Sequence, residues 1–468
     1  MANTHWGNEG DFRWLDLPQG TFELNGRWPS DRYRHPFFVL RNNATGEHFV
    51  GQLAWSGGYR FLFDLDAPPA TTESAAQLSF HAGLHGPAPQ RVLAPGETVC
   101  TPEMHLGAVF GDLDAAAQAM HEHLRHTVLM PQPRGRGGWI ESGIGPEIEV
   151  TEEQGYHAIE CAQELGAEIF FIDAGWYAPP REQWWATVGD WDVDRQRFPN
   201  GLAPFREQVH SRGMLWGLWM DAERIGPDSR AAKERPQWIL HGYDGRELGG
   251  MLDLTNPEAA RWMEERIRAV IEAHRLDFLR LDFNTGGCGR TDVGMALPPE
   301  HMDRLIGGQS GHTAAELDSQ WRLSLFGRPT FAFPKPMRSA RNPLLLARVR
   351  HCLTLYKDFV RPMMPSSRIC HHTPVAAGPE PHGWGVLELA SDERAHCICG
   401  LFQLGCPTQP EYPLRCGGLD LPRRYRVIWD NSGQECEIDG PTLMSRGITV
   451  RLEGALRSEL LIVDALQH

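Results

Sequence analysis

Ile169-Phe-Phe-Ile-Asp173 is one of three short apolar runs in the sequence that end in an aspartate. The other two are Met214-Leu-Trp-Gly-Leu-Trp-Met-Asp221 and Phe278-Leu-Arg-Leu-Asp282. Continuous apolar runs of this length are typical of strands that are buried on both faces of a parallel sheet. Carboxylates at the carboxyl ends of successive parallel strands are typical of a (β/α)8 barrel. The three runs therefore predict an α/β fold with a TIM-like barrel.

Helix boundary signals separate these runs, as a parallel sheet with crossover helices requires. Thr151-Glu-Glu-Gln154 is a capping box that predicts a helix start, and Gly166 is placed to end that helix. Asn256 and Pro257 predict the start of a long helix whose apolar residues recur at helical spacing. The order of strand and helix signals from residue 139 onward therefore supports the barrel.

Both flanks of the predicted barrel have the character of antiparallel β structure. Apolar and polar residues alternate through Tyr59–Asp66, which is the period-2 pattern of a half-buried strand. The strands expected near the C-terminus are Tyr425–Trp429, Ile448–Leu452 and Leu460–Val463. We therefore predict three domains: a β-sandwich-like region with a linking helix (113–128) at 1–130, the barrel at 137–375, and an antiparallel β domain at 380–468.

Charge and hydropathy exclude several classes of protein. The 468 residues include 45 basic and 60 acidic side chains, a net charge of −15, so nucleic acid is not an expected partner. No apolar run approaches the ~18 residues of a membrane span, and the N-terminus lacks the pattern of a secretory signal. We therefore expect a cytoplasmic protein without a membrane partner, and a homo-oligomer is compatible with the sequence.

The ten cysteines are scattered along the chain and are expected to be reduced thiols. The nearest pair, Cys397 and Cys399, is spaced C-x-C rather than C-x-x-C. Cys370-His371-His372 contains zinc-type ligands, but no second ligand pair follows at zinc-like spacing. We therefore predict neither a metal site nor an organic cofactor.

A set of motifs occurs in a fixed order between residues 172 and 284. The set comprises Ile172–Trp176, Gly189–Trp191, Phe198–Leu202, Gly213–Trp219, Leu252–Pro257 and Arg280–Asn284. In this order the motifs resemble the α-galactosidase (melibiase) family 36 of the glycoside hydrolases, most densely over residues 137–284. The resemblance implies a retaining glycoside hydrolase that acts on α-galactosides or related α-glycosides, so the expected partner is a carbohydrate.

The resemblance also implies roles for single residues. The family's nucleophile closes a K-W-D motif, and that position is Asp282, with Arg280 in place of the lysine. Asp173 matches the first aspartate of the family's D-D-G-W segment, but Ala174 replaces the second, which leaves galactose specificity open. The expected sugar contacts extend to Trp176, Trp191, Glu223, Arg280 and Asn284. Trp176 fits a core position equally well, and Glu223 fits a supporting role as well as a substrate contact.

The family's acid/base aspartate has no clear counterpart. Asp318 is the best candidate, because it precedes Phe331–Pro334, which is similar to the segment after the family's acid. Thr313-Ala-Ala-Glu316 is itself a capping box, however, and would place Asp318 on a helix surface. The 57 residues from 285 to 341 have room for two βα units of about 30 residues and not for four, so a shortened barrel is expected.

Two other functions remain open on the sequence alone. A carbohydrate-binding relative without catalysis would keep Asp173, Trp191 and Asp282 for sugar contact. A transglycosylase would use the same residues and would release transfer products in place of free sugar.

Overall fold

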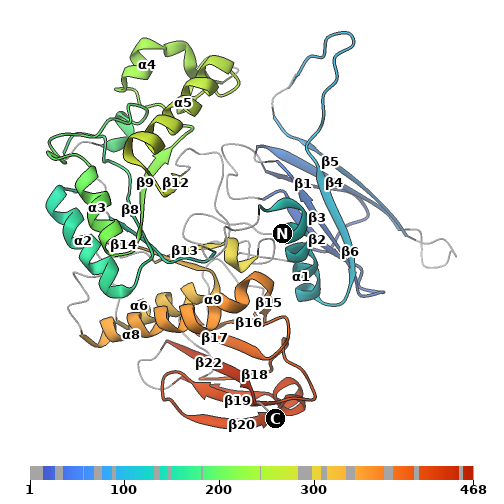
Figure 1. Ribbon diagram of the computed structural model, residues 1–468. Helices are drawn as coiled ribbons and strands as arrows, with labels where there is room; N and C mark the ends of the chain where they lie inside the picture. The colour runs from blue at the N-terminus through green and yellow to red at the C-terminus, as the bar shows by residue number, and fades with distance from the viewer. Residues whose placement is uncertain are drawn as a thin grey trace. The chain divides into compact units, whose positions relative to one another are not determined.

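The computed structural model shows two compact units (Figure 1). The described residues are 14–26, 35–55, 57–67, 76–86, 91–130, 137–144, 150–180, 183–242, 244–282, 298–306, 314–333, 343–373, 383–404, 410–452 and 457–466. One unit contains the N-terminal strands and ends its main segment at Pro131. The barrel strands and the C-terminal sheet share the other unit.

The N-terminal unit contains two three-stranded antiparallel sheets, with the orders β1-β4-β5 and β2-β3-β6. The strands are β1 (Gly20–Gly26), β2 (Phe37–Arg41), β3 (Glu47–Leu53), β4 (Tyr59–Asp66), β5 (Gln77–Leu84) and β6 (Met104–Phe110). Phe38 of β2 packs edge-on against Phe61 and Phe63 of β4, with ring centroids 5.4 and 5.0 Å apart. The two sheets therefore enclose one apolar core, as a β-sandwich does, and the strand predicted at Tyr59–Asp66 is confirmed.

Helix α1 (Leu113–His123) follows the last strand of this unit. Asp112 begins the helix by accepting a hydrogen bond from the backbone N of Ala115 over 2.8 Å. Leu124–Val128 continues it as one turn of π-helix. The helix predicted over residues 113–128 is therefore confirmed, and its buried face packs on Val50 of β3.

The second unit is built on a six-stranded sheet in which every pair is parallel. Its order is β12-β9-β8-β7-β14-β13. The strands are β7 (Glu141–Ile144), β8 (Ile169–Ile172), β9 (Leu215–Asp221), β12 (Phe278–Asp282), β13 (Asp303–Ile306) and β14 (Arg328–Phe333). The described residues contribute six strands to a sheet of the type that forms a (β/α)8 barrel, so the TIM-like fold is confirmed and its shortening stays a prediction.

The crossover helices begin and end at the residues that the sequence indicates. Thr151 accepts a hydrogen bond from the backbone N of Gln154 at the start of α2 (Glu152–Leu165), and Gly166 ends that helix with a φ of 79°. Asn256 caps α5 (Pro257–His274) in the same way through the backbone N of Glu258. The remaining helices of this unit are α3 (Ala203–Ser211), α4 (Arg230–Glu234), α6 (Ala314–Leu323), α8 (Pro343–Leu355) and α9 (Arg361–Met363). A short antiparallel pair, β10 (Ile239–His241) and β11 (Glu247–Leu252), lies between β9 and α5 in the sequence.

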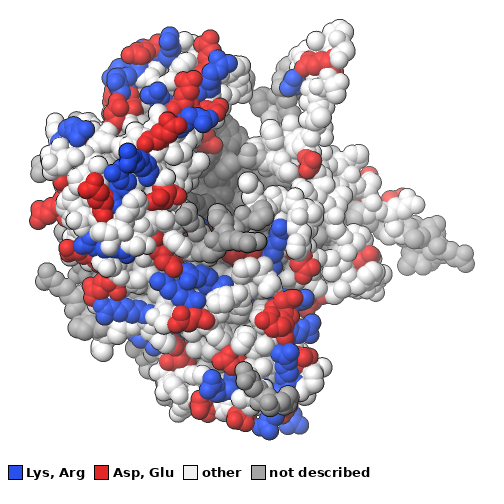
Figure 2. All heavy atoms as spheres, in the orientation of Figure 1, with Lys and Arg blue, Asp and Glu red and all other residues white. Residues whose placement is uncertain are grey.

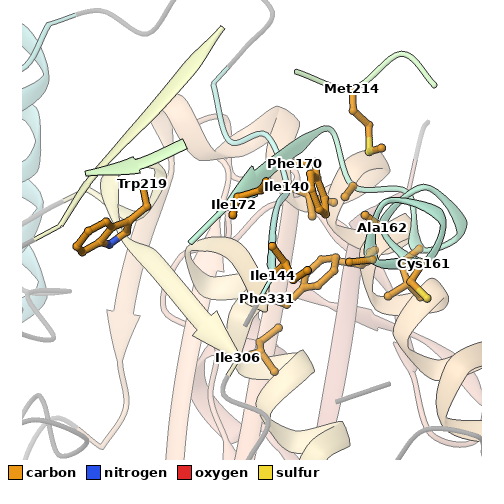
Figure 3. Packing of buried hydrophobic residues seen from close by; sticks show 14 of the residues in the cluster. Ile140, Ile144, Cys161, Ala162, Phe170, Ile172, Met214, Trp219, Ile306 and Phe331 are labelled. Carbon is orange, nitrogen blue, oxygen red and sulfur yellow. The ribbon is translucent and has the colours of Figure 1, made fainter. Parts of the chain in front are cut away.

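The main apolar core lies between the barrel strands and α2 (Figure 3). Ile140, Ile144, Phe170 and Phe331 group together there, each no more than 1% exposed. Burying each of these side chains stabilises the fold by about 1.5–3 kcal/mol. Trp219 belongs to the same core but lies apart from this group, on the β9 side of the sheet.

The C-terminal part contains a six-stranded antiparallel sheet with the order β15-β16-β17-β22-β19-β20 and a two-stranded sheet, β18-β21. The strands are β15 (Arg368–His371), β16 (Gly383–Ala390), β17 (His396–Leu404), β18 (Glu411–Leu414), β19 (Arg424–Trp429), β20 (Glu435–Asp439), β21 (Ile448–Arg451) and β22 (Ser458–Ala465). The antiparallel β region predicted here is confirmed. Its first strand, β15, falls inside the range 137–375 expected for the barrel, and the exact domain boundaries remain a prediction.

Charged side chains of both signs are interspersed over the face that Figure 2 shows. This mixture agrees with the scattered acidic and basic residues of the sequence. Within the described ranges, no helix combines the length and the apolar composition that crossing a membrane requires.

Candidate active site

Carboxylate side chains gather where three neighbouring barrel strands end. β9 and β12 are neighbours, and their last residues, Asp221 and Asp282, are paired across the two strands. Asp173 directly follows β8, which pairs with the other side of β9. The carboxyl ends of parallel strands meet at one edge of a sheet, so these aspartates share that edge with Glu223, two residues beyond β9. We call Asp173, Asp221, Glu223 and Asp282 the strand-end cluster.

Trp219 positions the side chain of Asp282. The indole Nε1 of Trp219 donates a hydrogen bond to Asp282 Oδ2 over 3.0 Å. Trp219 is completely buried, so its ring is a rigid donor. A hydrogen bond to the ionised carboxylate favours that form, which the predicted nucleophile requires. Asp173 is oriented more locally, because the backbone N of Ala174 donates to its Oδ1 over 2.8 Å.

Four aromatic rings pack together beside this cluster, and we call them the aromatic wall. They belong to Trp176, Tyr177, Trp191 and Trp219. The ring centroid of Trp191 lies 4.8 Å from that of Tyr177 and 6.2 Å from that of Trp219. Trp191 has a φ of 51°, in the left-handed region that a bulky residue enters at a cost of about 1–3 kcal/mol. Backbone strain of this kind is found most often at ligand sites.

Trp176 and Trp191, both expected as sugar contacts, differ in their hydrogen bonding. Trp176 is completely buried, and its Nε1 donates to the backbone oxygen of Trp219 over 2.9 Å, which favours the core position for this residue. The Nε1 of Trp191 and the hydroxyl of Tyr177 are also buried but have no hydrogen-bond partner in the described part of the chain. A buried polar group without a partner costs about 1–3 kcal/mol, so these two groups are suited to binding a ligand hydroxyl.

Glu223 carries a carboxyl group with a strongly altered acidity. Burial, together with the negative charge of Asp221, raises the pKa of Glu223 from 4.5 to about 7. Its Oε2 is buried and has no hydrogen-bond partner among the described residues. The backbone N of Glu223 donates to Asp221 Oδ1 over 3.4 Å, which keeps the two residues close. A carboxyl that is partly protonated near pH 7 can donate a proton where an ordinary glutamate cannot.

Arg280, expected as a sugar contact, is directed into the barrel interior. Its guanidinium donates to Glu141 Oε2 over 2.9 Å and to Asp303 Oδ2 over 2.8 Å. The same group lies 5.2 Å above the ring of Phe171. Glu141 is completely buried and also forms an ion pair with Arg328 at 2.7 Å. These contacts favour a structural role for Arg280, because two carboxylates already engage both of its terminal nitrogens.

Two further expected site residues are not part of the strand-end cluster as described. Asp318 lies on α6, where it forms ion pairs with Arg322 and Arg348, each at 3.2 Å. Arg322 in turn pairs with Asp430 at 2.8 Å, beyond the end of β19. Asp318 therefore belongs to an ionic network between α6, α8 and the C-terminal sheet, as the capping-box alternative implied. Asn284 lies outside the described residues.

Sequence reasoning did not single out Glu141, Tyr177 or Trp219. Glu141 stands inside the apolar context Ile140-Glu-Ser-Gly-Ile144, and a lone carboxylate in a buried strand is a signal of a paired charge. Trp219 was visible only as a member of a motif, and Tyr177 belonged to none. Their contacts with Asp282 and Trp191 join segments that are distant in the sequence.

Two family profiles and several curated relatives match this chain. The Melibiase profile matches residues 99–305, and that of the glycosyl hydrolase family 36 C-terminal domain matches residues 384–463. The α-galactosidase of Escherichia coli is 30% identical over 294 residues, which are 56% of this chain and 40% of the relative. The α-galactosidase AgaA of Geobacillus stearothermophilus is 27% identical over 314 residues, 64% of this chain and 41% of the relative. The chain thus spans about 40% of the length of these curated relatives.

Solved structures share the fold of this chain. The family 36 α-galactosidase AgaB of Geobacillus stearothermophilus superposes with a TM-score of 0.79 at 19% identity, covering 98% of this chain and 73% of that one. The galactosidase domain of the α-galactosidase–sucrose kinase AgaSK gives a TM-score of 0.81 at 16% identity, with 98% and 73% covered. With both profiles, the shared fold and the ordered strand-end motifs in agreement, this chain is an α-galactosidase-like protein of glycoside hydrolase family 36.

Proposed function

We propose that the protein is a retaining glycoside hydrolase that acts on α-galactosides or related α-glycosides, with Asp282 as the nucleophile. The observation that carries the proposal is the position of Asp282 at the carboxyl end of β12, where the indole of Trp219 donates to its carboxylate. The α-galactosidase names of the relatives support the same substrate class. A cytoplasmic location agrees with the free thiols of the described cysteines.

In the proposed mechanism, the Asp282 carboxylate attacks the anomeric carbon and forms a covalent glycosyl-enzyme while the leaving oxygen takes a proton. Water then cleaves this intermediate, and the acid acts as a base in that second step. The hydrogen bond from Trp219 holds one oxygen of this carboxylate in place. The positive charge that develops on the sugar ring is stabilised by the neighbouring carboxylates of the strand-end cluster.

The general acid is assigned to Glu223 rather than to Asp318. A retaining enzyme needs a protonated carboxyl about 5–5.5 Å from the nucleophile. Glu223 follows Asp221, the residue paired with Asp282 across the sheet, and burial raises the pKa of its carboxyl to about 7. Asp318 is held by two arginines beside the C-terminal sheet. We therefore propose Glu223, a member of the strand-end cluster, as the proton donor.

Sugar hydroxyls are assigned to Asp173, to the Nε1 of Trp191 and to the hydroxyl of Tyr177. The two buried donors lack partners within the described ranges, so a bound hydroxyl would satisfy them. Ala174 stands where the family pattern has a second carboxylate. The preferred sugar is therefore identified by comparing the hydrolysis of several α-glycosides that differ in their hydroxyl groups.

The first test is hydrolysis of an aryl α-galactoside by the wild type and by Asp282→Asn. The substitution is expected to lower kcat/KM about 10⁴-fold, or about 5.4 kcal/mol of transition-state stabilisation. Asp244→Asn is the matched control, because Asp244 is an exposed aspartate in the loop between β10 and β11. Equal rates for wild type and Asp282→Asn would remove Asp282 as the nucleophile.

A chemical rescue and an activated substrate separate the two carboxyl roles. In Asp282→Gly, azide can attack the anomeric carbon from the vacated side, and a β-galactosyl azide is the expected product. Glu223→Gln is expected to keep its activity on α-galactosyl fluoride, which needs little acid assistance, and to lose it on substrates with poor leaving groups. Calorimetric sugar binding without turnover of any substrate would identify a non-catalytic binding protein, and transfer products would identify a transglycosylase.

A further inference from the structure

Three cysteine side chains and one carboxylate meet in the interior of the C-terminal part. They are Glu388 of β16, Cys397 and Cys399 of β17, and Cys416, which follows β18. All four are buried, and their potential ligand atoms lie within 4.8 Å of one another. Cys399 is paired with Glu388 across β16 and β17, so the two side chains leave the same face of the sheet. We call these four residues the thiol cluster.

The spacing of the sulfur atoms matches a tetrahedral metal site. The Sγ atoms of Cys397 and Cys399 are 3.5 Å apart, and those of Cys399 and Cys416 are 3.9 Å apart. Zinc–sulfur bonds of about 2.3 Å at tetrahedral angles place neighbouring sulfurs about 3.8 Å apart. A disulfide between Cys397 and Cys399 fits less well, because it needs Cβ atoms about 3.8 Å apart and alternate residues of a strand are about 6.6 Å apart.

Glu388 is held in position by three hydrogen-bond donors. Gly417 and Gly418 donate backbone N–H groups to its carboxylate over 2.9 and 2.7 Å, and Nε2 of His372 lies 2.8 Å from Oε2. A Cβ atom at Gly418 would lie 2.4 Å from that of Ala390, so only glycine lets the chain after Cys416 approach so closely. Hydrogen-bond donors behind a carboxylate orient it for a metal ion.

Apolar packing alone accounts for only part of this arrangement. Buried cysteines commonly behave as small apolar side chains. The three cysteines belong to the same apolar core as Leu401, Val427 and Val463. Glu388 is different, because it is a buried carboxylate: His372 and two backbone N–H groups pair with it, and three thiols also lie within 4.8 Å of its oxygen. Three thiols and a carboxylate oxygen this close together form a possible ligand set for a metal ion, which apolar packing alone does not require.

We propose that Cys397, Cys399, Cys416 and Glu388 form a structural zinc site. On binding, each coordinating thiol releases its proton to solvent, and the ion ties the segment after β18 to strands β16 and β17. The negative charge that the four ligands bring is offset in part by the donors on Glu388 from His372 and the two glycines. The site is independent of the strand-end cluster, so its test does not depend on the proposed hydrolase activity.

The proposal is tested on the full chain, purified without chelators and with a phosphine reductant. Elemental analysis is expected to find about one zinc ion per chain. Replacing zinc with cobalt(II) is expected to give a thiolate-to-cobalt charge-transfer band and the intense visible bands of a tetrahedral site. Wild-type protein that holds no zinc and gives no such cobalt spectrum would overturn the proposal without relying on any variant.

Variants then locate the site. Cys416→Ser is expected to lose the charge-transfer band, whereas Cys436→Ser, a cysteine of β20 outside the cluster, keeps it. A strong chelator is expected to lower the Tm of the wild type and of Cys436→Ser. A folded Cys416→Ser with full metal content would contradict the site. So would wild-type protein prepared without reductant that, once denatured, titrates with eight thiols in place of the ten cysteines of the sequence.

Discussion

The two ends of the barrel strands carry the same residue types in opposite arrangements. At the amino ends, Glu141 and Asp303 open β7 and β13, and arginines engage both directly at 2.7–2.9 Å. At the carboxyl ends, Asp282 receives a neutral indole N–H, and Glu223 keeps an oxygen without a hydrogen-bond partner among the described residues. The first arrangement fixes charge for stability, whereas the second leaves carboxyl chemistry available to a substrate.

This difference teaches which acidic residues to assign to catalysis. Burial raises the pKa of Glu141 inside the barrel, but the positive charges of Arg328 and Arg280 oppose that rise and favour its ionised form. A carboxyl that is buried beside another carboxylate, as Glu223 is beside Asp221, has a pKa raised by burial and by that charge, and can exchange protons. The contrast is open to test through substitutions at each end.

The largest expected effect on stability is at the amino ends. Glu141→Ala removes the carboxylate between Arg280 and Arg328 and should lower the free energy of unfolding by about 3 kcal/mol, because buried cations lose a partner. Urea denaturation measures this loss. The control is Glu437→Ala, whose ion pair with Arg424 is 58–61% exposed and should cost less than about 1 kcal/mol. A loss of the same small size in both variants would mean that the interior network does not stabilise the barrel.

A smaller effect, dependent on pH, is expected at Glu223. Its folded pKa of about 7 exceeds the ordinary 4.5, so the folded state binds more protons between these values. The stability that Glu223 contributes is therefore complete below about pH 4.5 and is lost as the pH rises through about 7. Glu223→Gln, which stays neutral, should raise the Tm relative to the wild type at about pH 8 and change it little at about pH 4.5. Calorimetric scans at the two pH values measure the difference, and a Tm change independent of pH would refute the raised pKa.

The smallest effect is expected in the aromatic wall. Trp191→Phe removes the indole N–H that lacks a partner in the described part of the chain, and should leave the free energy of unfolding within about 1.5 kcal/mol of the wild type. If that N–H binds a sugar hydroxyl, KM for the aryl galactoside should rise about 2- to 10-fold with kcat nearly unchanged. Trp185→Phe, on a partly exposed tryptophan of the neighbouring segment, is the control. An unchanged KM would remove Trp191 from sugar binding.

Local signals made much of the fold predictable from the sequence. The caps Thr151, Gly166 and Asn256 act within a few residues of their own helix, so they could be read directly from the sequence. The strand-end aspartates could be identified for the same reason, because each directly ends or follows its strand.

Long-range contacts were the part that sequence reasoning could not reach. Arg280 and Glu141 are 139 residues apart, and Arg280 was expected to face a sugar because no local pattern shows which carboxylates enter the barrel interior. Asp318 could be placed on a helix, but its arginine partner at 348 and that residue's contact with Asp430 depend on how α8 meets the C-terminal sheet. The thiol cluster was missed because its ligands come from three separate segments and lack the spacing of a zinc motif.

The ion pair between Arg280 and Asp303 connects the first and last strands of the six-stranded sheet, β12 and β13. Among the described residues, β12 has backbone partners on one side only, namely in β9. The Arg280 side chain therefore links the two edge strands of the described sheet, two positions before Asp282. An arginine reaches farther than the lysine of the family pattern and can grip two carboxylates at once. The strand that carries the proposed nucleophile is in this way tied by one forked side chain to the opposite edge of the described sheet.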